Sequence, residues 1–341
     1  MKKTLKITAA CILVAGLTQN GAAQIATKSS KIGDGVYELV YNHKNGLVYV
    51  TTTRGNAEKP TIYALDGKTL QVKDSIVLET GAFGLGINQK TQTLYGTATR
   101  AGSVIAVDIK TGKTLATITN GQEKGHTREV VVDEANNKVY VSDVGGGIWE
   151  IDGKTNKHIQ QINGAGPSVT GLALDGKNSK LFAINFKTSN IVAIDLKTKN
   201  VIDSFPSGGE KAINLDFDAK RNRLYIAHTG SGSVSVLDAN TGEVVKSVET
   251  GKGALGIRYS PANDIIYVAN RGAQTVTIID AKDYSVKANL EAGSLPNTIV
   301  VDQNGVAYTS HKANGAGRPK QGEKPKPSND PNGDIISRIS L

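Results

Sequence analysis

A repeat of about 43 residues runs along this chain and restricts its fold more strongly than any other feature. An aromatic residue within an apolar triplet recurs seven times at intervals of 41 to 46 residues, at Tyr49, Tyr95, Tyr140, Phe182, Tyr225, Tyr267 and Tyr308. An aspartate recurs beside it at intervals of 42 to 44 residues, at Asp66, Asp108, Asp152, Asp195, Asp238 and Asp280. Two series with one period indicate a repeat architecture.

Each repeat reads as four short strands. In the sixth repeat, 256–259, 265–270, 275–280 and 286–290 are rich in Val, Ile and other strand formers, with turn residues such as Asn and Asp between them. Four strands per unit of this length are typical of a propeller blade. The sequence therefore predicts an all-β chain, a seven-bladed β-propeller with four-stranded antiparallel blades.

The last repeat is one strand short at its C-terminal end. Residues 334–341 supply its third strand, and 25–32, which precede the first inner strand at Tyr37, can supply the fourth. Pairing these segments removes an exposed strand edge that would invite aggregation. We expect the N-terminal strand to close the last blade in this way.

Residues 1–23 predict a secretory signal peptide. Lys2, Lys3 and Lys6 precede an apolar run at 7–17, and small residues at 21–23 suit cleavage. The run is shorter than the roughly 20 residues that span a bilayer. We expect a periplasmic or secreted chain without a membrane span, with 24–341 forming a single monomeric propeller domain. The only cysteine, Cys11, lies in the signal, so we expect no disulfide.

The chain is basic, with a formal net charge of +9, and removing the three signal lysines leaves +6. Such a surface favours acidic partners such as nucleic acid, anionic glycans or lipid headgroups, although it also suits a merely soluble protein. A segment at 312–331 is rich in lysine and proline and is predicted to be a mobile loop inserted in the last blade.

Several second strands carry a recognisable signature. Close or milder variants of Tyr-Val-Thr-Asn occur at Ile266-Tyr267-Val268-Ala269-Asn270, Val139-Tyr140-Val141-Ser142-Asp143 and Leu181-Phe182-Ala183-Ile184-Asn185. The chain resembles the exported Tyr-Val-Thr-Asn (YVTN) repeat propellers, and among them the periplasmic YncE-type proteins, over its whole mature length. The resemblance implies a propeller with no known catalysis, for which binding of single-stranded DNA has been proposed. We therefore expect a non-catalytic binding protein without a cofactor.

A binding site is expected on the face formed by the loops between second and third strands and by the loops between blades. The first set of loops supplies five cations, at Arg54, Arg100, Lys187, Arg271 and Lys312, and the second supplies Tyr37, Phe83 and Arg128. Cations on one rim can track a phosphate backbone, and aromatic rings can stack on bases. We assign the five cations to phosphates, Tyr37 and Phe83 to bases, and Arg128 to either. The competing interpretation is solvated loop charges and aromatic rings that merely pack in the channel.

Two other functions stay open at this stage. The position after Tyr37 and its equivalents in other blades carry oxygen-bearing side chains, namely Glu38, Glu129 and Asn214. These side chains could hold calcium in a lactonase-like or lyase-like enzyme. Alternatively, the two carboxylates could simply pair with Arg128 or Arg258. A protein-interaction scaffold of the cell envelope is the other alternative. His126, His228 and His311 are expected on the same rim, on blades too far apart to share a metal, so no metal site is assigned.

Overall fold

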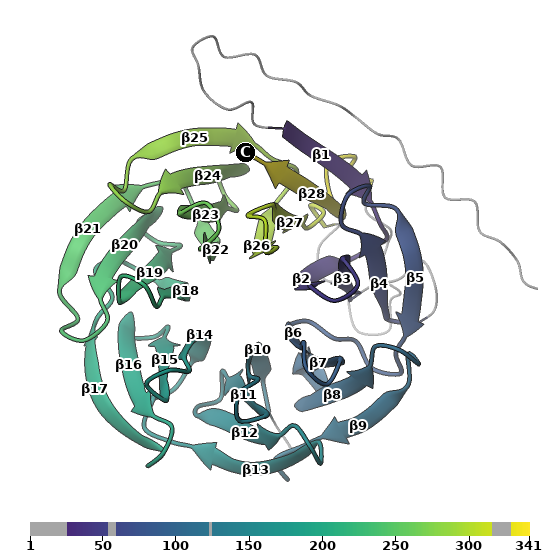
Figure 1. Ribbon diagram of the computed structural model, residues 1–341, viewed down its shortest axis with the longest axis horizontal. Coiled ribbons are helices and arrows are strands. Elements are labelled where there is room, and N and C mark those ends of the chain that lie inside the picture. Colours follow the sequence, from purple (N-terminus) through teal and green to yellow (C-terminus); the bar gives the residue numbers. More distant parts are fainter. Residues whose placement is uncertain (1–25, 54–58, 123–124, 316–328) are drawn as a thin grey trace, which may run out of the picture.

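The computed structural model describes residues 26–53, 59–122, 125–315 and 329–341 and confirms the seven-bladed β-propeller. Seven four-stranded antiparallel sheets surround one axis (Figure 1). Blades 1 to 6 are β2–β5, β6–β9, β10–β13, β14–β17, β18–β21 and β22–β25, and blade 7 combines β26–β28 with β1. The predicted signal peptide and Arg54 lie outside the described residues, as does most of the 312–331 insertion.

In blades 1 to 6 the strands follow the chain from the axis outward, and in blade 7 β1 takes the outermost place after β26, β27 and β28. The innermost strands are β2 (Val36–Asn42), β6 (Leu85–Asn88), β10 (Thr127–Asp133), β14 (Val169–Asp175), β18 (Ala212–Asp218), β22 (Ala254–Ser260) and β26 (Pro296–Val301). The second strands are β3 (Leu47–Thr52), β7 (Thr93–Ala98), β11 (Lys138–Asp143), β15 (Lys180–Asn185), β19 (Arg223–His228), β23 (Ile265–Asn270) and β27 (Ala307–His311).

The third and fourth strands form the outer half of each blade. The third strands are β4 (Thr61–Asp66), β8 (Ser103–Asp108), β12 (Ile148–Asp152), β16 (Asn190–Asp195), β20 (Ser233–Asp238), β24 (Thr275–Asp280) and β28 (Ile335–Ser340). The outermost strands are β5 (Val72–Val77), β9 (Thr114–Ile118), β13 (Lys157–Ile162), β17 (Asn200–Pro206), β21 (Val244–Glu249), β25 (Val286–Glu291) and β1 (Ala26–Lys31). No helix among the described residues is long and apolar enough to cross a membrane.

The predicted closure of the ring is confirmed. Strand β1 pairs antiparallel with β28 along its whole length, from Ala26 opposite Ser340 to Lys31 opposite Ile335. The buried carboxylate of Asp334 accepts hydrogen bonds of 3.0 Å from the backbone amides of Gly35 and Val36. The first and last elements of the chain are therefore joined by a strand pair and by a side chain.

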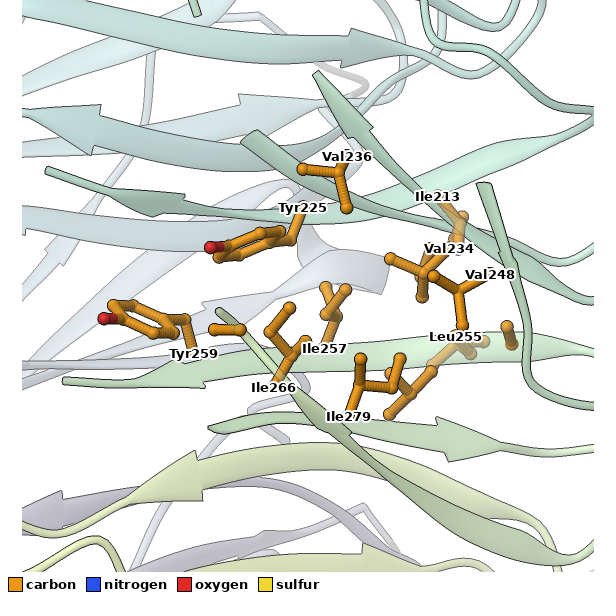
Figure 2. Packing of buried hydrophobic residues seen from close by; sticks show 14 residues of the cluster. Ile213, Tyr225, Val234, Val236, Val248, Leu255, Ile257, Tyr259, Ile266 and Ile279 are labelled. Atoms are coloured by element: carbon orange, nitrogen blue, oxygen red, sulfur yellow. The ribbon is translucent and has the colours of Figure 1, made fainter. Parts of the chain in front are cut away.

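Both repeat series have a structural cause. The aromatic series is buried between blades, and Figure 2 shows one such layer, where Tyr225 of blade 5 and Tyr259 of blade 6 lie with ring centroids 5.5 Å apart. The aspartates end the third strands. Asp66 accepts the amides of Lys68 and Thr69 at 3.1 and 2.8 Å, which fixes the following hairpin turn.

Candidate functional site

The inner strands carry β-bulges near the end that faces the predicted binding loops. In β2, Val36 pairs with Thr52 and Leu39 with Val50, so Tyr37 and Glu38 both lie opposite Thr51. Similar register shifts occur in β10, β14, β18, β22 and β26. A bulge bends the strand and redirects side chains, so these shifts set where the residues at this end of the propeller point.

Hydroxyl groups on second strands satisfy the amides at these positions in four successive blades. The backbone amide of Thr298 donates to the hydroxyl of Ser310 at 3.3 Å, and that of Glu38 donates to Thr51 at 3.0 Å. In the next two blades the amide of Gly84 donates to Thr97 at 2.8 Å and that of Glu129 donates to Ser142 at 2.9 Å. Each acceptor is the third residue of its Tyr-Val-Thr-like segment. The hydroxyl at this position therefore provides a partner for a backbone amide near the start of the inner strand.

Three of these hydroxyls also join one blade to the next. Ser310 donates to the carbonyl of Tyr37 at 2.7 Å, Thr51 to that of Phe83 at 2.9 Å and Thr97 to that of Arg128 at 3.0 Å. The three carbonyls belong to the three residues predicted for the loops between blades. A hydrogen bond from the preceding blade thus holds the backbone of each of them.

The rings of Tyr37 and Phe83 meet edge to face, with centroids 5.2 Å apart and planes at 81°. Each ring also has a cation over it. The Lys312 ammonium lies 4.3 Å from the centre of the Tyr37 ring, and the Arg100 guanidinium carbon lies 5.7 Å from the centre of the Phe83 ring. Both arrangements have the distance of a cation–π contact, which holds the charge above the ring.

Two arginines complete the group. Arg271 donates a hydrogen bond from its guanidinium to Asn297, whose side-chain amide donates to the carbonyl of Tyr37 at 2.9 Å. Burial lowers the pKa of Arg271, and the charge of nearby Arg128 lowers it further. Arg271 nevertheless stays protonated, because a guanidinium does not lose its proton in proteins. We call Tyr37, Phe83, Arg100, Arg128, Arg271 and Lys312 the mouth cluster.

Six of the eight predicted site residues therefore lie together at one end of the axis. Lys187 is exposed on the turn between β15 and β16, and the ring and electrostatic contacts that join the mouth cluster do not include it. No ion pair found among the described residues includes Arg100, Arg128 or Arg271. The cluster is thus an accumulation of positive charge, and the roles assigned to its members stay predictions.

A small polar cavity follows the mouth cluster along the axis. Its volume is about 20 Å³, roughly the space of one water molecule. Glu38, Glu129, Asn214, Arg258 and Thr298 line it together with glycine and aliphatic residues. Burial, with a smaller contribution from the charge of Glu129, raises the pKa of Glu38 to about 8. Burial also raises the pKa of Glu129, although Arg258 and Arg128 oppose that shift.

Arg258 is the cation that sequence reasoning named as a partner for these carboxyl groups, but its main partner was missed. Its guanidinium lies 3.4 Å from Asp216, whose charge is the largest cause of the raised pKa of Arg258. The sequence held one signal for this pair, because Asp216 follows Asn214 by two residues and so shares its face of β18. No group of three or more His, Cys, Asp or Glu side chains within the described part of the chain is placed to hold a metal.

The expected position of two histidines on the rim is wrong. His228 and His311 end β19 and β27 and are fully buried, while His126 is exposed. Burial lowers the pKa of both buried imidazoles to about 4. The ring of His228 lies 2.9 Å from the hydroxyl of Ser235, as expected of a side chain inside a blade. Trp149 is buried in β12.

Comparison with known proteins gives one consistent result. The family described as YNCE-like beta-propeller matches residues 17–226. The chain is 30% identical over 264 residues to the "Uncharacterized protein YncE" of Escherichia coli O157:H7. The aligned region covers 73% of this chain and 74% of that protein. It is 29% identical over 269 residues to the protein of the same description from Salmonella typhi, covering 74% and 75% of the two chains.

Proposed function

Because this chain belongs to the YncE-like β-propeller family, whose fold is compatible with many functions, we propose its function from the site: an exported, non-catalytic binding protein for an anionic polymer, with single-stranded DNA as the leading candidate. The observation that carries the proposal is the mouth cluster, where two aromatic rings each lie beneath a cation and two arginines lie nearby. None of its three arginines belongs to an ion pair found among the described residues, and such an accumulation of cations suits a ligand that brings several negative charges.

The arrangement favours phosphate contacts over stacking as the main interaction. Arg100 and Lys312 each lie over a ring, so Phe83 and Tyr37 hold the charges in place and offer bases only the remaining ring surface. Single-stranded DNA is the leading candidate because it brings both phosphates and unpaired bases to this mixed surface. A sulphated glycan would use the cations alone.

The first test measures the fluorescence anisotropy of a labelled single-stranded oligonucleotide with the protein at low and moderate salt. A duplex and a sulphated glycan are measured beside it. We expect the single strand to bind most tightly and to weaken steeply with salt. Equal binding of all three would reduce the proposal to a non-selective basic surface, and the absence of binding at low salt would refute it.

A matched pair of variants locates the site. Replacing Arg100, Arg128 and Lys312 with alanine removes three contacts, so the slope of log K against log salt should become shallower by about 2. The control replaces the exposed residues Lys110, Lys154 and Lys177, which lie on hairpin turns at the opposite end of the axis. The same charge change there should leave the slope as it is. Equal effects of the two triple variants would contradict the proposed location.

A further inference from the structure

The channel cavity combines several charged groups in a space of about 20 Å³. The inner strands facing it contribute Glu38 from β2, Glu129 from β10, Arg258 from β22 and, behind Arg258, Asp216 from β18. The lining residues of β14 and β26 are Gly171, Leu172, Thr298 and Ile299, none of which titrates. Arg128 follows the same strand as Glu129 and acts on it electrostatically.

The charges around the cavity do not balance within it. Asp216 lies 3.4 Å from Arg258 and accepts the backbone amide of Tyr259 at 2.8 Å, so it is the nearest partner of that guanidinium. Two carboxyl groups, Glu38 and Glu129, then face the same space, with a share of the Arg258 charge and the charge of Arg128 to offset them. Two carboxylates that line one small cavity repel each other, so one of them is expected to keep a proton.

The inner strands that line the cavity pack closely against one another. A Cβ atom on Gly171 would lie 2.8 Å from the Cα of Asn214, and one on Gly256 would lie 2.6 Å from the carbonyl oxygen of Asn297. Adjacent inner strands therefore touch backbone to backbone at this level. This packing fixes the positions of the strands that carry Glu38 and Glu129, and both of these residues are half-buried.

We propose that Glu38 and Glu129 form a proton-binding site in the channel, which holds one proton at neutral pH and releases it in mildly alkaline solution. Glu38 is the group that carries the proton. Burial and the charge of Glu129 raise the pKa of Glu38 to about 8, whereas Arg258 and Arg128 oppose the rise at Glu129. The site does not depend on the binding of a polyanion, so it stands or falls separately from the proposed function.

Carboxyl NMR tests this site directly. The protein is labelled with ¹³C at the glutamate δ-carbons and titrated from acidic to alkaline pH. We expect one resonance with a midpoint near pH 8, and we expect Glu38→Gln to remove it. Glu129→Gln should move that midpoint toward acid, because it removes a neighbouring negative charge. Glu79→Gln is the control, since the Glu79 side chain is 86% exposed and pairs with Lys59 at the surface.

Three results would overturn the proposal. The first is that every glutamate of the unmodified protein titrates near the ordinary value of about 4.3, which needs no variant to fold. The second is an alkaline titration that survives Glu38→Gln. The third is a midpoint that moves with the sodium or calcium concentration at constant ionic strength, because the cavity would then hold a cation in place of the proton.

Discussion

Replacing Thr97 with valine should destabilise the protein by removing one hydroxyl that joins the second and third blades. Thr97 is fully buried, and its Oγ1 accepts the amide of Gly84 at 2.8 Å and donates to the carbonyl of Arg128 at 3.0 Å. Valine has nearly the same shape. The substitution therefore tests the two hydrogen bonds with little change in packing.

The expected magnitude follows from what valine leaves behind. A Cβ on Gly84 would lie only 1.9 Å from the Arg128 carbonyl oxygen, so the two backbones touch and no water can enter to replace the hydroxyl. A buried donor or acceptor without a partner costs about 1 to 3 kcal/mol. With one of each, Thr97→Val should lower the free energy of unfolding by about 2 to 5 kcal/mol.

Urea denaturation followed by fluorescence measures this change, because Trp149 is fully buried in the third blade and reports on the neighbourhood of the lost bond. Thr97→Ser is the matched control, since it keeps both hydrogen bonds and loses one methyl group, at a cost of about 1 kcal/mol. If the valine variant proved as stable as the serine variant, the hydroxyl would not support the blade junction and the reasoning would be wrong.

Two further predictions concern the closure of the ring and acid stability. Asp334→Ala removes the acceptor for the amides of Gly35 and Val36, so urea denaturation should show a loss of about 2 to 4 kcal/mol, and Asp334→Asn, which keeps an acceptor oxygen, should lose less. The pKa of His228 and His311 falls to about 4 in the folded protein, so the unfolded chain takes up protons that the folded one resists. The stability from this source is complete above about pH 6.5 and is lost as the pH falls toward 4, so melting temperatures should decline over that window, and less so in His311→Asn.

The fold could be predicted because its demands recur along the chain. Tyr95 and Tyr267 are buried at equivalent places. Each blade needs such a residue, so a single sequence period identifies all seven. The closing strand was predicted at 25–32 and observed at Ala26–Lys31, because a blade that lacks its fourth strand can be completed by the other end of the chain. These inferences need only strand length, alternation and the cost of an open edge.

The candidate site was predictable only as a set of loops. Lys187 and Lys312 both follow an aromatic of the same series, yet only Lys312 reaches a mouth aromatic. Which cations meet depends on the reach of the side chains and on the bulges, and neither follows from spacing. The histidines were misplaced although a signal existed. His228 and His311 occupy the position of Asn270, the last residue of the signature, and that position is buried in all three blades.

The bulges also bring the two proposed sites together. Tyr37 and Arg128 of the mouth cluster are followed directly in the chain by Glu38 and Glu129 of the cavity. A proton lost from Glu38 would therefore place a negative charge one residue away from Tyr37, whose ring lies beneath the Lys312 ammonium. Because linkage is reciprocal, a polyanion at the mouth would strengthen proton binding in the channel to the same extent that the proton strengthens polyanion binding. The length of that connection is one peptide unit, so the coupling needs only Coulomb attraction and no movement of the blades.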